Sequence, residues 1–583
     1  MGFIKPSLPD LDLQEWGEKP RMERVKPMIQ EWAQSGFGAP DAVLVLYAVK
    51  IALYVGGALF FASITPGVGS LGDLEAWWTE PIVFQKVVVF TLLFEILGFG
   101  CGFGPLTLRF LPPIGAFLHW LRPGTIRLPP WPDHIPGTRG TGRGLIDVLL
   151  YAAVIGSALW ALLSDGVADG PVSGAAGVLP PTPLVAMLGF LALIGLRDKT
   201  IFLAARTEVY GAFVLTFFLS DVDMIVAAQL VMVLIWWGAA TSKLNQHFPY
   251  VVATMSSNSP VLRLKAVKRL FHRSWPDDIR PSGLSGALAH GGTVIEFVVP
   301  LVLLLSDGGV VTNVAAVVML LFHLHILTSL PMGVPLEWNV FMMFGIGVLF
   351  VDYADQGLGD LTDPLLVVLV VLPSVVLVVL GNLYPEKISF LMSMRYYAGN
   401  WATSMWCLKP SAIAKIDAYV VKSSQLPLDQ LTRLYGAEMA WVMLHKGYAF
   451  RAMHTHGRAL FGLIPRAAGP LHEVDYIPMD GEFVAGATIG WNFGEGHLHN
   501  EQLLAALHER CAFEEGEVRI IVVESQQFWR PVQLYRLVDA VTGEFERGEI
   551  AVQDLIDRQP WDTDIPTHVV EPRPVTESGV ANA

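Results

Sequence analysis

The feature that most constrains this chain is a series of apolar runs, most of them close to 20 residues long, separated by more polar segments. A helix of about 20 apolar residues spans the hydrocarbon core of a bilayer. Lipid offers no partners to backbone polar groups, so such a run must satisfy them internally as a helix. Ten spans are predicted, near residues 41–64, 81–104, 145–164, 183–196, 200–219, 224–243, 287–305, 313–330, 338–352 and 365–384. The fold class expected is therefore an all-α polytopic membrane bundle of about ten transmembrane helices.

Composition and charge agree with a membrane protein. The 583 residues are 53% hydrophobic and 16% charged, whereas soluble chains carry about 25% charged residues. The net charge of −14 argues against a nucleic-acid partner. Lys and Arg gather in the N-terminal arm and in the loops after the second and sixth runs, and none occurs in loops 65–79, 165–182, 220–223, 306–312 and 353–364. Basic loops stay in the cytosol, so we expect a multi-pass protein of the cell (inner) membrane with both termini cytosolic.

The two ends of the chain have a different character from the apolar middle. Residues 1–40 are expected to form an amphipathic cytosolic arm, and 41–384 the transmembrane domain. The stretch MRYYAGNWATSMWCLKP is expected to lie at the membrane interface. Beyond it, the sequence predicts FVAGATIGW as a strand, EQLLAALHERC as a helix, VRIIVVES as a strand and VQLYRLVDAV as a second helix. Residues 385–565 should thus form a small α+β or α/β cytosolic domain, followed by a disordered tail over 566–583.

Ionisable residues inside the predicted spans are costly in lipid and mark candidate sites. They are Lys50, Lys86, Glu95, Arg206, Glu208, Glu296, His323 and His325. The structural explanation is that Lys50 and Lys86 snorkel or pair with Glu95, and that Arg206 and Glu208 form ion pairs. Glu296 has no charged neighbour in its own segment, so we expect its carboxylate to face the bundle interior, within reach of Lys243, His290 or His323.

Three segments resemble the vitamin-K-dependent γ-glutamyl carboxylase and its relatives, the HTTM (horizontally transferred transmembrane) family. They are IWWGAATSKLNQHF, the stretch ALAHGGTVIEFVVPLVLLL at 287–305, and FHLHILTSLPMGVPLEWNVFMMF at 322–344. Their order and spacing are similar across roughly residues 85–384. The chain also looks like an actinobacterial membrane family of unknown activity that carries an added C-terminal cytosolic domain.

The resemblance implies an intramembrane enzyme that acts with a quinol or lipid. Lys243 falls at the position of the carboxylase's active-site lysine, a neutral amine that deprotonates a reduced quinone of the vitamin K or menaquinol type. The catalytic candidates are Lys243, Glu296, His323 and His290, and the substrate-binding candidates are Trp236, Trp237, Asn245, Glu95 and Glu208. The charge pattern places Lys243 on the cytosolic side, opposite to the animal carboxylase, which fits a quinol or lipid reaction better than γ-carboxylation. A close ion pair with Glu296 would instead make Lys243 a structural anchor.

The cytosolic region adds two His-x-His pairs, His497 with His499 and His454 with His456. This spacing suits a metal when both rings leave one side of a strand, but no cysteine cluster completes a zinc signature. We therefore predict no metal site and keep the four histidines as weak candidates, with packed loop histidines as the alternative.

Two other functions stay open from the sequence. The protein could be a non-catalytic membrane anchor or scaffold that docks a protein partner through its cytosolic domain. It could also be a proton- or ion-coupled transporter that uses Glu95, Glu208 and Glu296. The lack of detectable inverted repeats argues against the transporter.

Overall fold

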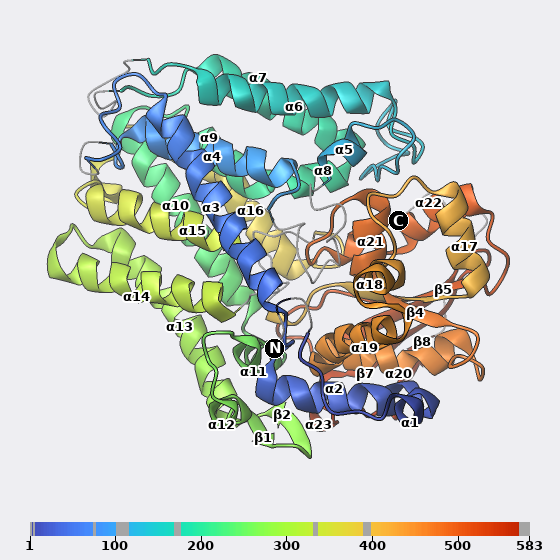
Figure 1. Ribbon diagram of the computed structural model, residues 1–583. Helices are drawn as coiled ribbons and strands as arrows, with labels where there is room; N and C mark the ends of the chain where they lie inside the picture. Colours follow the sequence, from blue (N-terminus) through green and yellow to red (C-terminus); the bar gives the residue numbers. More distant parts are fainter. Residues whose placement is uncertain are drawn as a thin grey trace.

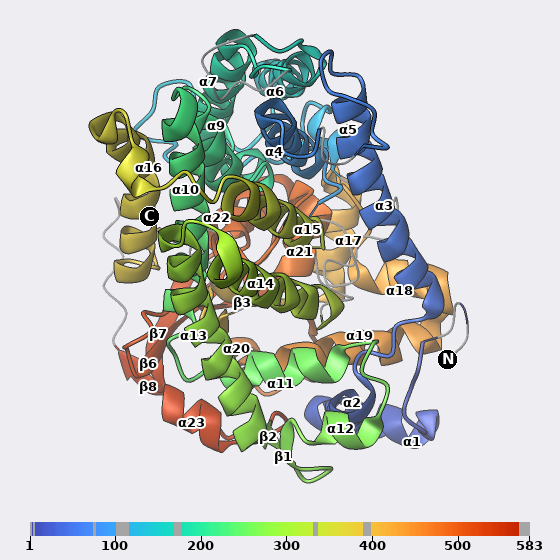
Figure 2. The ribbon, with the colours of Figure 1, turned by 90° about the vertical axis from the view of Figure 1, so that its left-hand side faces the viewer.

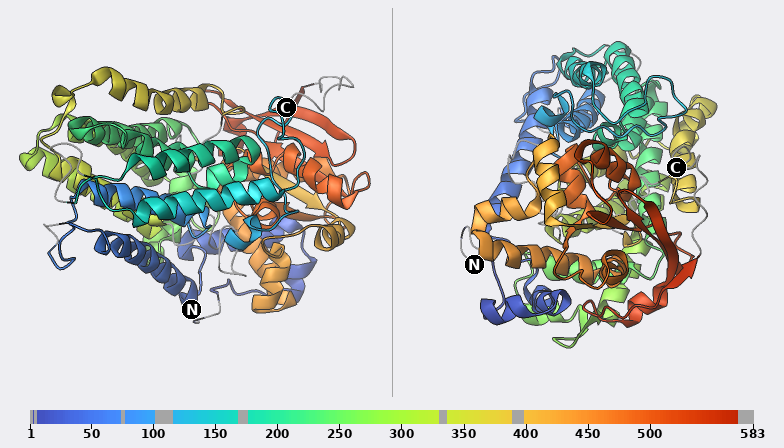
Figure 3. Two further views of the ribbon diagram at one scale, coloured as in Figure 1. Left: turned by 90° about the horizontal axis from the view of Figure 1, so that it is seen from above. Right: turned by 90° about the vertical axis from the view of Figure 1, so that its right-hand side faces the viewer.

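The computed structural model describes residue 3 and residues 6–73, 77–100, 116–167, 176–329, 336–388 and 398–570. Apolar helices occupy one side of the molecule, and a region of strands and shorter helices occupies the other (Figure 1; Figure 3). Within the described residues, six helices are long and apolar enough to cross a membrane: α3 (Asp41–Ser63), α6 (Leu145–Leu163), α10 (Asp221–Ser242), α13 (Gly283–Leu305), α14 (Gly309–Ser329) and α16 (Pro364–Leu383). The protein is thus membrane-embedded, although the expected count of ten spans is not confirmed.

The other four predicted spans are shorter or interrupted helices. The second is α4 (Pro81–Ile96), whose side chains are all buried by other helices, and residues 101–104 of that prediction lie outside the described residues. The fourth is α7 (Pro181–Arg197), with 17 residues. The fifth divides into α8 (Lys199–Ala204), the π-helix η3 (Thr207–Gly211) and α9 (Ala212–Thr216), because Arg206 adopts a left-handed backbone with φ of 49°. The ninth is α15 (Leu336–Gly345), which continues as the π-helix η4 (Ile346–Asp352).

The long helices present large apolar side chains outward. Figure 2 looks onto α10, α13, α14 and α16, and exposed side chains on these elements include Val310, Val314, Leu321 and Leu365. A contiguous apolar surface of this kind is unfavourable in water. It is the surface that a helix needs where it faces lipid tails.

The C-terminal region contains a six-stranded antiparallel sheet in the order β4-β3-β5-β6-β7-β8. Its strands are β3 (Thr403–Leu408), β4 (Ile477–Asp480), β5 (Val518–Val523), β6 (Val532–Asp539), β7 (Gly543–Ala551) and β8 (His568–Val570). Helix α20 (Thr455–Ala468) packs on β3 and β5, and α19 (Ala437–Met453) packs on α20. The other helices are α17 (Pro410–Tyr419), α18 (Pro427–Tyr435), α21 (Gly481–Ile489), the 3₁₀ turn η8 (Gly496–Leu498), α22 (Glu501–Cys511) and α23 (Val552–Asp557).

Several local predictions in this region were wrong, although its mixed α and β character was right. VQLYRLVDAV forms β6, in which buried and half-buried residues alternate with the period of two that a strand requires. FVAGATIGW lies in α21, which begins where the Asp480 side chain accepts a hydrogen bond from the Glu482 amide. In the stretch expected at the membrane interface, residues 394–397 lie outside the described residues, and Thr403–Leu408 form β3 with all six residues buried. The tail expected from 566 includes β8, and residues 571–583 lie outside the described residues.

The N-terminal arm and the basic loops all contact the C-terminal region. The arm forms α1 (Leu13–Glu18) and α2 (Arg21–Ser35), and α2 packs against α19. Helix α5 (Phe117–Trp120) donates from Trp120 Nε1 to the Ile489 carbonyl at 2.8 Å, and in the loop after α5 the Thr141 carbonyl accepts from Arg510 Nη2 at 3.0 Å. Beyond α11 (Phe248–Asn258) and α12 (Lys265–Arg269), the hairpin of β1 (His272–Ser274) and β2 (Asp278–Pro281) donates from Arg280 Nη1 to the Asp557 carbonyl at 2.9 Å. These basic segments therefore share one face of the molecule.

Candidate functional site

The most apolar cavity described here lies among α10, α11, α13, α14 and α15, and we call it the membrane cavity. Its volume is about 570 Å³. Most of its lining is aliphatic or aromatic, including Trp236 and Trp338. Its polar side chains are Lys243, Ser256, Glu296, His323, His325, Ser329 and Asn339. Three of the four catalytic candidates from the sequence thus meet at one cavity.

Lys243 and Glu296 form a close ion pair in the wall of the membrane cavity. Lys243 is the residue after the last turn of α10, and its Nζ lies 2.5 Å and 2.6 Å from the two carboxylate oxygens of Glu296 on α13. The Lys243 and Glu296 side chains are 9% and 4% exposed. The Nζ also lies 5.4 Å from the ring centroid of Phe248. The prediction that Glu296 faces the interior within reach of Lys243 is confirmed, and this pair favours a charged lysine over a neutral amine.

His323, which also lines the membrane cavity, is held in one tautomer. Trp236 Nε1 donates to His323 Nε2 at 3.0 Å, and His323 Nδ1 lies 2.9 Å from Asn339 Oδ1. An indole N–H can only donate, so Nε2 accepts and Nδ1 carries the proton that goes to the amide oxygen. Both ring nitrogens are therefore hydrogen-bonded. His323 links Trp236 to Asn339 and has no free lone pair for a ligand.

The membrane cavity reaches the lipid-facing surface between α13 and α14. Leu288 and Leu321 line it and are 46% and 60% exposed. Gly291 also lines it, and a Cβ added there would meet no atom within 4 Å. An apolar molecule in the bilayer could therefore enter sideways through this opening.

The remaining candidates from the sequence lie elsewhere. His290 is exposed on α13 and does not line the membrane cavity, and Trp237 Nε1 donates to the Phe297 carbonyl at 3.0 Å. Asn245 Oδ1 accepts from the amides of His247 and Phe248 at the start of α11. Glu95 and Glu208 are buried and line another part of the helix bundle.

The intramembrane charges pair differently from the sequence expectation. Lys50 Nζ lies 2.9 Å from Glu337 Oε2, and not against Glu95. Lys86 Nζ donates to Thr65 Oγ1 at 2.8 Å. Arg206 Nη1 lies 3.6 Å from Glu95 Oε1 and its guanidinium lies 4.4 Å from the Trp338 ring centroid. These partners are distant in sequence, so the pattern of one segment could not identify them.

His497 belongs to an ion-pair network in the C-terminal region. Its Nε2 lies 2.6 Å from Glu524 Oε1 and its Nδ1 lies 3.2 Å from Glu495 Oε1. Glu524 also accepts from Arg536 at 3.0 Å. Burial lowers the pKa of His497, but the charges and hydrogen bonds of Glu524 and Glu495 outweigh it and raise that pKa from 6.5 to about 10. His497 is therefore an imidazolium in the folded protein at neutral pH.

This network predicts a pH-dependent contribution to stability. A folded pKa above the unfolded value of 6.5 gives stabilisation that is complete below pH 6.5 and is lost as the pH rises toward 10. Between these limits the wild type should lose about 1.5–3 kcal/mol more unfolding free energy than His497→Gln, the range for hydrogen bonds to charged groups. Thermal unfolding in detergent across this pH range measures the difference. Parallel profiles for the two proteins would contradict the assignment.

The other three candidate histidines lie near Arg451, a residue that the sequence analysis missed. Arg451 Nε donates to Asp480 at 2.6 Å, Nη2 lies 3.2 Å from Glu482, and Nη1 donates to His456 Nε2 at 3.1 Å. Burial lowers the pKa of His454 and of His499 to about 3 and that of His456 well below its ordinary value. In the described part of the chain, no three His, Cys, Asp or Glu side chains are placed to hold a metal. The sequence feature that could have indicated Arg451 is an arginine in the otherwise apolar run YAFRAM, directly before HTH.

The segment that holds Lys243 also joins the two parts of the molecule. His247 Nδ1 lies 2.6 Å from Thr455 Oγ1, and its Nε2 lies 2.9 Å from Gln526 Oε1. Asn245 Nδ2 donates to the Ala398 carbonyl at 3.1 Å. The close spacing of Lys, Asn and His after the two tryptophans thus reflects one ion pair within the bundle and three hydrogen bonds to the C-terminal region.

Comparisons with known proteins identify the family of this chain. Neither a search of curated proteins nor a search of solved structures found a match. No finding links the chain to the HTTM or carboxylase group. One family model, described as a transmembrane protein of unknown function (DUF3556), matches residues 1–570. The chain therefore belongs to the DUF3556 family of transmembrane proteins.

Proposed function

We propose that this protein binds an elongated apolar molecule of the quinol or lipid class within the bilayer, with the polar end of that molecule at Lys243 and Glu296. The observation that carries the proposal is the membrane cavity itself, about 570 Å³ of largely apolar space with one ion pair in its wall. Small-molecule sites have volumes of about 300–1,000 Å³ and combine apolar walls with a few polar groups. The Lys and Arg pattern supports a cytosolic position for this polar end, the C-terminal region and both termini.

The ion pair suits a ligand that carries a hydroxyl or a carbonyl group. An ammonium has three donors and a carboxylate has about four acceptor positions. Two contacts between Lys243 Nζ and the Glu296 oxygens leave a donor and several lone pairs for a ligand. A quinol hydroxyl can donate to the carboxylate, and a quinone or ester carbonyl can accept from the ammonium.

The same geometry favours binding over proton abstraction by a neutral lysine. A neutral amine at Lys243 would forfeit its ion pair with a carboxylate 2.5 Å away in apolar surroundings. His323 has no free nitrogen to replace it as a base. We therefore assign Lys243 and Glu296 to recognition of the ligand's head.

Blocking the lipid-facing opening tests this function. The full chain in detergent is titrated with a short-chain menaquinone, and quenching of tryptophan fluorescence reports binding because Trp236 and Trp338 line the membrane cavity. Diacylglycerol is added as a competitor. Gly291→Phe fills the open space at the mouth, so the menaquinone should bind at least about tenfold more weakly, or about 1.4 kcal/mol.

Gly156→Phe is the matched control. Gly156 is exposed on α6, and a Cβ there also meets nothing within 4 Å. This variant should bind like the wild type. Equal affinity in the Gly291→Phe protein, or saturable binding of neither probe to the wild type, would refute the proposal.

A further inference from the structure

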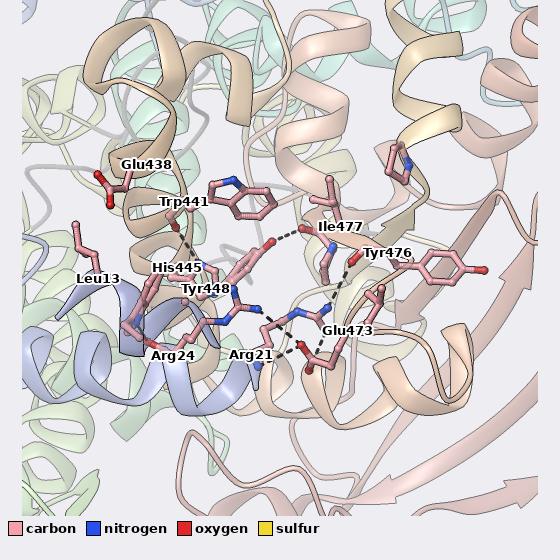
Figure 4. Close-up of a pocket in the computed structure, with 15 residues that line it drawn as sticks. Leu13, Arg21, Arg24, Glu438, Trp441, His445, Tyr448, Glu473, Tyr476 and Ile477 are labelled. Atoms are coloured by element: carbon pink, nitrogen blue, oxygen red, sulfur yellow. Dashed lines mark hydrogen bonds and ion pairs between the residues drawn. The ribbon is translucent and has the colours of Figure 1, made fainter. Parts of the chain in front are cut away.

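A second cavity lies between the N-terminal arm and the C-terminal region, and we call it the arm cavity. Its volume is about 460 Å³, and its walls come from α1, α2, α19 and residues 473–478. These elements lie on the sheet-bearing side, away from α7 and α14 (Figure 1). Figure 4 shows Arg21 and Arg24 extending toward Glu473, near the rings of Trp441, His445 and Tyr448. Among the described residues, none of the six long apolar helices contributes to the lining of the arm cavity.

Two guanidinium groups in this cavity face a single carboxylate. Arg21 Nη1 and Arg24 Nη2 lie 3.6 Å and 3.8 Å from the two oxygens of Glu473. Charge-assisted hydrogen bonds are typically about 2.7–2.9 Å long, so these ion pairs are loose. The Glu473 side chain is 34% exposed and Arg21 is 5% exposed. Arg21 is also fixed by donating to the His472 carbonyl at 2.9 Å. Arg21 is therefore fixed in the wall of the cavity, whereas the partly exposed Glu473 is held by these two long ion pairs and by one hydrogen bond from the Arg21 amide at 3.2 Å, which a competing anion can replace.

His445 supplies a buried acceptor that has no partner. Its Nδ1 donates to the Trp441 carbonyl at 2.8 Å, so Nε2 carries the lone pair. That Nε2 makes no hydrogen bond, although His445 is 1% exposed and lines the arm cavity. Burial, together with Arg24 and Arg21, lowers the pKa of His445 to about 3, which keeps the ring neutral. The Arg24 Nε is also buried without a hydrogen-bond partner. A buried polar atom left unpaired is unfavourable by about 1–3 kcal/mol, which a ligand that pairs with it would recover.

The remaining walls are aromatic and suit a flat ring. Trp16 packs edge-on against His445 with centroids 4.9 Å apart, and the Arg24 guanidinium lies 5.8 Å from the Trp16 ring centroid. Tyr448 and Trp441 complete this side. Lys409 Nζ lies 5.5 Å from the ring centroid of Tyr476, which adds positive charge near the opposite wall.

We propose that the arm cavity binds a small, soluble organic anion that carries a ring and a hydroxyl group. Its carboxylate or phosphate replaces Glu473 between Arg21 and Arg24, its ring stacks among Trp16, Trp441 and Tyr448, and its hydroxyl donates to His445 Nε2. This site is separate from the membrane cavity, so its test is independent of the proposed quinol or lipid binding.

Calorimetric titration of the full chain in detergent tests the site with three probes: 4-hydroxybenzoate, benzoate and inorganic phosphate. The hydroxylated ring acid should bind most tightly. Arg24→Gln should weaken it at least about tenfold, as expected for loss of one charged contact. His445→Phe should keep the ring packing but abolish the preference for 4-hydroxybenzoate over benzoate. Glu473→Gln should tighten binding severalfold, because it removes the competing carboxylate.

Lys26→Gln is the matched control for Arg24→Gln. Lys26 lies on the same helix, is similarly half-buried and stacks on Trp561 outside the arm cavity. Its loss removes the same charge and should leave affinity unchanged. The proposal is overturned if no probe binds at about 10 mM, if phosphate binds as tightly as 4-hydroxybenzoate, or if Lys26→Gln weakens binding as much as Arg24→Gln.

Discussion

Glu296→Leu should lower the unfolding free energy by about 3–5 kcal/mol, because it leaves the Lys243 ammonium buried without its carboxylate. Nζ contacts both oxygens of Glu296 at 2.5 Å and 2.6 Å, and each side chain is less than a tenth exposed. The double variant Lys243→Met, Glu296→Leu removes both charges and replaces them with apolar groups of similar size. It should recover most of the loss, since such replacements of buried pairs are often neutral or stabilising.

Reversible unfolding in mixed detergent micelles measures all three proteins. Menaquinone titration of the double variant then separates stability from recognition, because the fold is retained while the polar end of the membrane cavity is gone. A Glu296→Leu protein as stable as the wild type, or a double variant less stable than Glu296→Leu, would contradict a buried ion pair.

Arg451→Met should also cost about 3–5 kcal/mol, because it removes the cation that two buried carboxylates contact. Arg451 donates to Asp480 at 2.6 Å and lies 3.2 Å from Glu482, while a third nitrogen donates to His456. Arg451→Lys should fall between the wild type and Arg451→Met, since an ammonium keeps the charge but not the planar fork that reaches three partners.

Thermal unfolding and proteolysis of the C-terminal region report this effect. Glu546 pairs with Arg466 at an exposed site, so Arg466→Met is the control, and it should cost no more than about 1 kcal/mol. If Arg451→Met matched that control, the Arg451 cluster would not hold the region together.

The sequence was informative where a pattern repeats within one segment. The length and composition of the apolar runs predicted the membrane class, and the absence of charged neighbours around Glu296 predicted its inward orientation. The mixed composition after residue 385 predicted an α and β region. The alternation in VQLYRLVDAV was also readable, yet its leucines and arginine suit a helix as well. Pairing with β5 and β7 stabilises this segment as a strand.

Features that depend on distant partners could not be predicted in this way. Lys50 pairs with Glu337, which lies near the other end of the predicted transmembrane domain in the sequence. No residue close to Lys50 in the sequence indicates that partner. At Arg206, where the fifth predicted span is interrupted, the guanidinium contacts Glu95 and the Trp338 ring, both far away in the sequence. The arm cavity joins residues near 20 to residues near 445 and 475. Each partner alone looks like an ordinary surface or helix residue.

Because the arm packs on the C-terminal region, its full packing can form only after the C-terminal region has been synthesised. The amide of Arg21 donates to Glu473, 452 positions later, and Lys446 donates to the Phe37 carbonyl. During translation α2 emerges before every membrane helix, but α19 emerges after all of them. The apolar face of α2, with Val25, Met28 and Trp32, therefore lacks its full cover while the helices between enter the bilayer. Such long-range closure is slow, so a chain that stops before α19 is inserted in the membrane with α2 packed against α11 and α12 but without α19.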